Sequence, residues 1–118
     1  MANQVDYFEI GSPDPQASQA FYGGLFGWQF GDPSPAAYQM VNGMEGGLWD
    51  SSGQGDEHWA IFYVHVDNVQ ASLDQAVSLG AKVAVPFVDN GRIQFAHLID
   101  PDGNRFAIWK PLAPAPVE

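Results

Sequence analysis

The sequence predicts an α+β fold in which two βαβββ modules form one curved, eight-stranded mixed sheet with the helices on its outer face. The main observation is a repeat: segments 8–18 and 62–72 both read as an apolar alternating run, an Asp-bearing turn and Gln-Ala-Ser opening a helix. Self-similarity of this kind marks stacked structural units, and 118 residues leave room for two. Because such a sheet is covered by helices on one face only, its other face is predicted to be concave.

The first module begins with a predicted strand at residues 5–10, where apolar and polar side chains alternate. Its period of two puts Tyr7 and Glu9 on one face and Phe8 and Ile10 on the other. We assign the Phe8 face to the helix-covered core, together with the other apolar rings Phe21, Phe26 and Phe62.

A helix follows this strand. Asp14 is a side-chain cap and Pro15 suits the first helical position, while Gly27 is a plausible stop. The predicted apolar stripe at helical spacing consists of Ala17, Ala20, Phe21 and Leu25. The module then continues through three short predicted strands at residues 28–30, 38–41 and 44–49. Asn42-Gly43 is predicted to be the hairpin turn between the last two.

The second module repeats this order after a small, polar segment at 51–57, which is predicted to be a flexible linker. A strand at 59–66 precedes a cap at Asp67-Asn68 and a helix whose apolar stripe is Val69, Leu73, Ala76, Val77 and Leu79. Strands are predicted at 82–85, 93–99 and 106–109, with a loop at 86–91. We therefore expect a single domain with module one at about 4–50, module two at about 58–110 and a loose tail at 111–118.

The charge balance excludes several classes of partner. Four Lys and Arg against 14 Asp and Glu give a net charge of −10, which argues against nucleic acid and against an anionic membrane surface. The negative charge either maintains solubility or attracts a cationic small molecule. Cysteine is absent, which removes thiolate metal sites and disulfides. No apolar run is long enough for a membrane span, and no secretory signal is visible, so we expect a cytoplasmic protein.

At this point the motifs resemble those of the vicinal oxygen chelate superfamily, which includes glyoxalase I, extradiol dioxygenases and bleomycin resistance proteins. The resemblance covers about residues 5–110. It is carried by Phe8-Glu9-Ile10 with Asp14-Pro15, Ala20-Phe21-Tyr22, Leu25-Phe26-Gly27-Trp28, Val66-Asp67-Asn68, Leu79-Gly80-Ala81 and the stretch from Asp100 to Phe106. One fold hosts many chemistries, so the resemblance implies an architecture before it implies a reaction.

The metal-dependent members of this superfamily hold one divalent ion with four inward side chains, two from each module. The usual His positions fall here on Tyr7 and Ile61, and the usual Glu positions fall on Ala107 and within residues 46–49, which read Gly-Gly-Leu-Trp. Ile61 and Ala107 cannot coordinate a metal, and tyrosine is an uncommon ligand. We therefore expect neither a metal site nor a cofactor.

The remaining polar and aromatic residues could form a different site. Glu9 and His65 share faces with the lost ligand positions, and they are candidates for an acid–base pair or a ligand-orienting pair. The alternative is a solvated or mutually bonded strand-end pair. His97 lies on a strand whose facing the pattern does not fix. The candidate ligand-binding residues combine aromatic walls with a few polar groups and are Tyr7, Glu9, Tyr38, Trp49, Tyr63, His65, Arg105 and Trp109.

These observations favour a metal-independent binding protein of the glyoxalase and bleomycin-resistance class, with a cationic or aromatic small organic ligand in the concave cavity or at a dimer seam. The alternative is a glyoxalase-like lyase or isomerase, or a dioxygenase-like enzyme, with an atypical metal site or a Glu9/His65 acid–base pair. A third possibility is a dimeric module with a vestigial pocket. A homodimer is expected from the resemblance alone.

Overall fold

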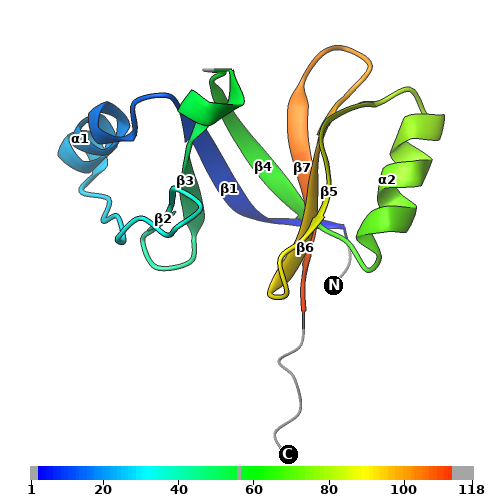
Figure 1. The fold of residues 1–118 in the computed structure, drawn as a ribbon, viewed down its shortest axis with the longest axis horizontal. Helices are drawn as coiled ribbons and strands as arrows, with labels where there is room; N and C mark the ends of the chain where they lie inside the picture. Colours follow the sequence, from blue (N-terminus) through cyan, green and yellow to red (C-terminus); the bar gives the residue numbers. More distant parts are fainter. Residues whose placement is uncertain (1–2, 56, 113–118) are drawn as a thin grey trace, which may run out of the picture. The chain divides into compact units, whose positions relative to one another are not determined.

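The computed structural model describes residues 3–55 and 57–112 and shows an α+β fold (Figure 1). Its described part has two α-helices and seven strands, which form one mixed sheet in the order β2-β3-β1-β4-β7-β6-β5. The chain divides into two compact units, one of residues Tyr7–Phe62 and the other of the residues up to Asp6 and from Tyr63 onward.

In the unit Tyr7–Phe62, three strands lie side by side. Strand β1 (Gln4–Ser12) pairs in parallel with β3 (Gly46–Asp50), and β3 pairs antiparallel with β2 (Tyr38–Val41). The turn before β3 contains Asn42 and Gly43 with φ of 50° and 77°, the left-handed values that a tight hairpin requires. The predicted hairpin through Asn42-Gly43 is confirmed, but its loop has four residues, 42–45, because Val41 pairs with Gly46. Strand β3 therefore begins at Gly46 and not at the predicted residue 44.

Helix α1 (Pro15–Phe26) has the predicted ends. Asp14 accepts a hydrogen bond from the Ala17 N–H at 3.2 Å, which satisfies one of the N–H groups left open at a helix start. Gly27 closes the helix in the left-handed conformation at φ 70°. The core of this unit consists of Ile10, Val41 and Leu48, with partly buried Phe8, Tyr22, Trp28 and Phe30 around it.

The other unit has a similar order of elements. The last residues of β4 (Trp59–His65) pair in parallel with β7 (Arg105–Pro111), while β6 (Ile93–Ile99) pairs antiparallel with β7 and with β5 (Lys82–Asp89). Helix α2 (Val69–Ser78) is capped by Asn68 and lies along these strands (Figure 1). The core consists of Val66, Val69, Leu73, Ala96, Leu98 and Ile108.

Three expectations about the elements are wrong. Residues 28–30 form no strand, only one isolated bridge from Phe30 to Val41, so the described chain has seven strands where eight are predicted. The predicted loop 86–91 is largely strand, because β5 continues through Pro86 to Asp89 with shifts in register. Proline is tolerated there because β5 is an edge strand. In the predicted linker, Ser51–Gln54 forms a 3₁₀ turn capped by Asp50.

The predicted facing of α1 is also wrong. The helix has no buried residue, and Phe21, Leu25 and Phe26 are 57–60% exposed. Phe62 is exposed as well, whereas Phe8 packs in the core as predicted. Helix α1 instead turns Tyr22 toward its own sheet. In α2, Val69 and Leu73 are buried as expected, but the later stripe residues Val77 and Leu79 are exposed.

Within the described residues, no helix has the length and apolar character needed to cross a membrane. Residues 113–118 of the predicted tail lie outside the described part of the chain.

Candidate ligand-binding site

The unit Tyr7–Phe62 is strongly acidic. Its sequence contains seven Asp and Glu and no Lys or Arg, because all four basic side chains of the protein lie after residue 80. Charge of one sign on a unit of this size raises the local concentration of oppositely charged small molecules. Among the acidic residues of this unit that the structure describes, Glu9 is the one that is buried.

Glu9 lies on β1 and is 1% exposed. Its Oε2 accepts a hydrogen bond from the indole Nε1–H of Trp59 on β4 at 2.8 Å. Trp59 is itself buried, so the bond forms away from water, where a hydrogen bond to a charged group is strong. The structure thus places a carboxylate inside the unit and fixes its orientation with a tryptophan.

A run of aromatic rings continues from Trp59. Trp49 meets Trp59 edge to face with ring centres 5.7 Å apart, and Tyr38 meets Trp49 at 6.4 Å. The hydroxyls of Tyr38 and Tyr7 are 2.7 Å apart and share a hydrogen bond. Tyr7, Tyr38 and Trp49 are partly exposed. We call Tyr7, Glu9, Tyr38, Trp49 and Trp59 the Glu9 cluster.

Two glycines make room for the Glu9 cluster. A Cβ added at Gly47 would collide with the Tyr38 hydroxyl, and one added at Gly11 would collide with the Trp59 indole. Strand glycines often mark such close approaches. Gly47 lies within the segment where the resemblance places a Glu ligand, and here the phenol of Tyr38 lies against it.

Burial raises the pKa of the Tyr7 hydroxyl to about 12, and the Glu9 carboxylate adds to the rise, while the hydrogen bond with Tyr38 opposes it. Tyr7 is therefore a neutral phenol at ordinary pH, because both burial and a nearby negative charge disfavour the phenolate.

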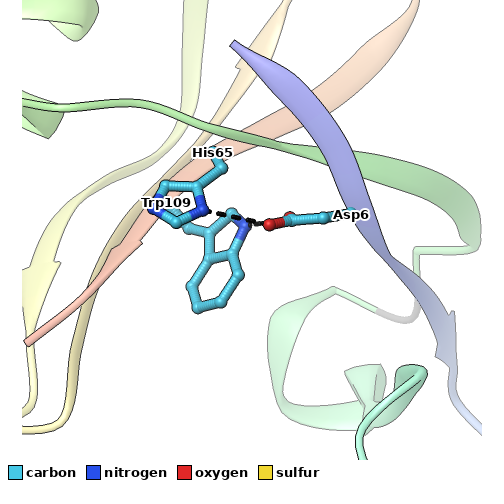
Figure 2. Close-up of polar contacts among 3 residues, drawn as sticks. All are labelled: Asp6, His65 and Trp109. Carbon is cyan, nitrogen blue, oxygen red and sulfur yellow. Dashed lines mark hydrogen bonds and ion pairs between the residues drawn. The ribbon is translucent and has the colours of Figure 1, made fainter. Parts of the chain in front are cut away.

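A second polar group lies in the other unit, where three neighbouring strands contribute one residue each (Figure 2). Asp6 of β1 binds His65 Nδ1 of β4 at 3.0 Å through Oδ2, and it accepts the indole N–H of Trp109 of β7 at 2.8 Å through Oδ1. The imidazole and indole centres are 5.3 Å apart. We call these three residues the Asp6 cluster.

The same unit also contains a buried histidine, His97, with polar neighbours at both ring nitrogens. His97 is 0% exposed; its Nε2 is 2.9 Å from the Tyr63 hydroxyl and its Nδ1 is 3.2 Å from Arg105 Nη1. A guanidinium only donates hydrogen bonds, so Nδ1 accepts and the ring proton lies on Nε2, directed at the Tyr63 oxygen. The facing of His97, which the sequence pattern leaves open, is inward.

The predicted site residues therefore fall into groups within the units. Tyr7, Glu9, Tyr38 and Trp49 belong to the Glu9 cluster, His65 and Trp109 belong to the Asp6 cluster, and Tyr63 and Arg105 flank His97. Glu9 and His65 each have a partner inside their own unit. The sequence interpretation missed Trp59 and Asp6. A tryptophan on one predicted strand and a glycine on another are a signal for the first. Alternation places Asp6 on the face of Phe8 and Ile10, so it gives no signal for the second.

The positions that the resemblance assigns to metal ligands do not fit a metal ion. Ile61 and Ala107 are buried apolar residues, and residues 46 and 47 are glycines. Tyrosine is an uncommon metal ligand, and the Tyr7 hydroxyl here shares a hydrogen bond with Tyr38. In residues 3–55 and 57–112, no three His, Cys, Asp or Glu side chains are grouped to hold a metal.

A surface hollow of about 340 Å³ adjoins the Glu9 cluster. It is lined by Gly11 and Trp59 together with Tyr22, His58 and neighbouring residues of the same unit. Trp59 thus contacts both the buried carboxylate and a space open to a ligand.

Comparison with known families matches the model of the glyoxalase-like domain to residues 7–109. An anthracycline biosynthesis protein of Streptomyces peucetius, DnrV, is 29% identical over 88% of this chain and 46% of its own length. The chain spans about half the length of the two anthracycline biosynthesis proteins that it matches.

Solved structures share the fold at low identity. The Mn(II)-bound glyoxalase from Novosphingobium aromaticivorans is 18% identical with a TM-score of 0.62, over 99% of this chain and 42% of that one. A glyoxalase/bleomycin resistance protein/dioxygenase superfamily member from Vibrio splendidus 12B01 is 16% identical with a TM-score of 0.60, over 92% of this chain and 98% of that one. The superfamily resemblance predicted from the motifs is confirmed.

Proposed function

We propose that this chain, which belongs to the glyoxalase-like domain family, is a small-molecule-binding member of the family that needs no metal ion. The Glu9 cluster is its binding site, and a cationic organic molecule with an aromatic part is its ligand.

The observation that carries this proposal is the Glu9 carboxylate, 1% exposed and held by Trp59 beside partly exposed aromatic rings. Burying a carboxylate is costly, and a charge kept in a low-dielectric environment acts strongly on a nearby cation. The faces of Tyr38 and Trp49 attract cations through their ring quadrupoles. Ring faces and carboxylate therefore favour the same class of ligand.

The size of the adjoining hollow agrees with this ligand class. Its volume of about 340 Å³ lies within the range of roughly 300–1,000 Å³ that is usual for small-molecule sites. DnrV and the second relative of this chain, DauV from Streptomyces sp. (strain C5), are anthracycline biosynthesis proteins, so an anthracycline that carries an amine is a suitable first probe.

A thermal-shift screen of EDTA-dialysed protein tests the proposal. A ligand that binds only the folded state raises the melting temperature with concentration. Amine-bearing anthracyclines and simple aryl ammonium compounds are expected to raise the melting temperature more than matched neutral compounds. If no cationic compound does so at millimolar concentration, the proposal is wrong.

An enzyme of the glyoxalase-like class is the second candidate. The observation that favours it is the contact between Asp6 and His65, which orients an imidazole at a partly exposed position. The predicted pairing of Glu9 with His65 as acid and base remains a proposal. If it holds, Glu9→Gln removes turnover of an aldehyde-derived or aromatic substrate, and unchanged turnover excludes it.

The quaternary state is proposed from the family alone. We expect a homodimer, with its seam as an additional location for ligand, and sedimentation velocity distinguishes it from a monomer.

A further inference from the structure

The Asp6 cluster has a feature that the Glu9 cluster lacks: a histidine with a defined proton position. An ionised carboxylate only accepts hydrogen bonds, so the ring nitrogen 3.0 Å from Asp6 Oδ2 must be a donor. His65 therefore carries its proton on Nδ1. In the neutral ring the lone pair then lies on Nε2, on the opposite side of the imidazole from Asp6 (Figure 2).

Asp6 is well suited to hold this arrangement. Its second oxygen accepts the Trp109 indole N–H at 2.8 Å, so both carboxylate oxygens are engaged by side chains of neighbouring strands. The Cα atoms of His65 and Trp109 are register partners in the parallel pair β4–β7. Because all three residues lie on strands, the imidazole is positioned by rigid elements, as a functional group requires.

The His65 side chain is partly exposed. The side chains of His65 and Asp6 are 30% and 36% exposed. In the part of the chain that the structure describes, the His65 side chain makes its hydrogen bond through Nδ1, and no hydrogen bond reaches Nε2. The Trp109 indole, tilted by 39° to the imidazole at 5.3 Å, provides an aromatic surface next to it.

We propose that His65, oriented by Asp6, is a proton-accepting subsite for a planar conjugated ligand with an acidic hydroxyl, such as a phenol, whose ring lies against Trp109. The ligand O–H donates to Nε2. When the proton transfers, the O–H electron pair stays on the ligand oxygen, giving a phenolate beside an imidazolium. The Nδ1–H bond to Asp6 persists, so the carboxylate stabilises the new positive charge. This step needs no metal, and it does not depend on the Glu9 cluster.

The experiment uses the full chain and 4-nitrophenol, whose ionised form absorbs at longer wavelength than the neutral form. Protein is added at a buffered pH at which most of the free probe is neutral, and the absorbance of the phenolate is recorded. The expected result is a saturable rise in phenolate absorbance with protein concentration. The methyl ether 4-nitroanisole, which has no O–H, should bind at least tenfold more weakly.

Two variants locate the effect. His65→Gln keeps an amide donor for Asp6 but removes the base, so it should abolish the phenolate signal. Asp6→Asn should reduce that signal at least fivefold and should also remove the Nδ1–H tautomer of His65 in ¹⁵N NMR spectra, a change that loss of packing alone would not produce. The matched control is Asp67→Asn, which removes an exposed carboxylate from the same unit and should leave the signal unchanged.

If a variant fails to fold, the measurements of the wild-type protein with 4-nitrophenol and 4-nitroanisole still test the proposal. No phenolate signal at saturating protein, or equal binding of the phenol and its methyl ether, overturns the proposal. A signal that persists in folded His65→Gln overturns it too. Since neither probe is cationic, these outcomes neither support nor contradict the cation site proposed around Glu9, which the thermal-shift screen tests separately.

Discussion

Trp59 donates its indole N–H to Glu9, and this single bond connects a buried carboxylate to a ring that also lines a surface hollow. The two residues lie on strands β4 and β1 and are far apart in sequence. A charge-assisted bond between them fixes both side chains. The Glu9 carboxylate is therefore already oriented, and under the proposed function this orientation would reduce the cost of binding a ligand.

The first prediction concerns this bond. Trp59→Phe removes the donor while keeping an aromatic ring, and it should lower the free energy of unfolding by about 1.5–3 kcal/mol, the usual contribution of a hydrogen bond to a charged group. Glu9→Gln should lower it less, because the amide oxygen still accepts. Urea unfolding of both variants and the double variant measures the coupling. Purely additive effects would show that the bond contributes nothing to stability.

The second prediction concerns the space that glycine provides. In Gly47→Ala the new methyl group collides with the Tyr38 hydroxyl, so the variant should lose about 1–3 kcal/mol of stability, as overpacked sites do. Gly24→Ala is the control, because nothing lies within 4 Å of its added Cβ and it is in helix α1. That substitution should stabilise by up to about 1 kcal/mol. Similar thermal midpoints for the two variants would contradict the close packing of Tyr38 against Gly47.

The third prediction follows from the Tyr7 hydroxyl, whose pKa rises from 10.0 to about 12 on folding. The folded protein therefore holds this proton more tightly than the unfolded chain. The resulting stability is fully present below pH 10 and is lost as the pH rises from 10 to 12. Between these limits the wild-type protein should lose up to about 2 kcal/mol more than Tyr7→Phe. Parallel pH profiles from urea unfolding would rule this out.

The fourth prediction is that His65 and His97 hold opposite tautomers. Asp6 is an acceptor, so His65 has its proton on Nδ1; Arg105 is a donor, so His97 has its proton on Nε2. Two-bond ¹H–¹⁵N correlation spectra distinguish the two forms. In Arg105→Met, His97 should no longer favour the Nε2–H tautomer, while His65 should keep its proton on Nδ1. The same tautomer on both rings would refute the assignment.

Much of the fold could be predicted because local signals agree with the structure. Asp14-Pro15 starts α1, Gly27 ends it, and Asn42-Gly43 makes the turn before β3. The errors arose where contacts with residues distant in the sequence decide which face is buried or whether a segment pairs as a strand. An apolar stripe on α1 predicts a buried face, but periodicity does not reveal which face meets the sheet. Pro86 suggests a loop, yet an edge strand tolerates it because one side of its backbone has no ladder to form.

The contacts within the candidate site were predictable in part for a similar reason. Alternation put Tyr7 and Glu9 on one face, and both are in the Glu9 cluster. Gly46 and Gly47 read as missing ligands, but nothing local indicates that Tyr38 lies against Gly47. Partners such as Trp59 for Glu9 and Asp6 for His65 depend on strand neighbours that are distant in sequence, which one sequence does not specify.

The most direct test of the central claim is the affinity of EDTA-dialysed protein for an amine-bearing anthracycline and for its neutral aglycone, measured by fluorescence titration with wild type and Glu9→Gln. We expect the metal-free wild type to bind the amine-bearing compound, and added Mn²⁺ or Zn²⁺ should not tighten binding. Glu9→Gln should weaken this binding at least tenfold, about 1.4 kcal/mol, with no change for the aglycone. Binding that requires added metal, or equal affinities in wild type and Glu9→Gln, would contradict that claim.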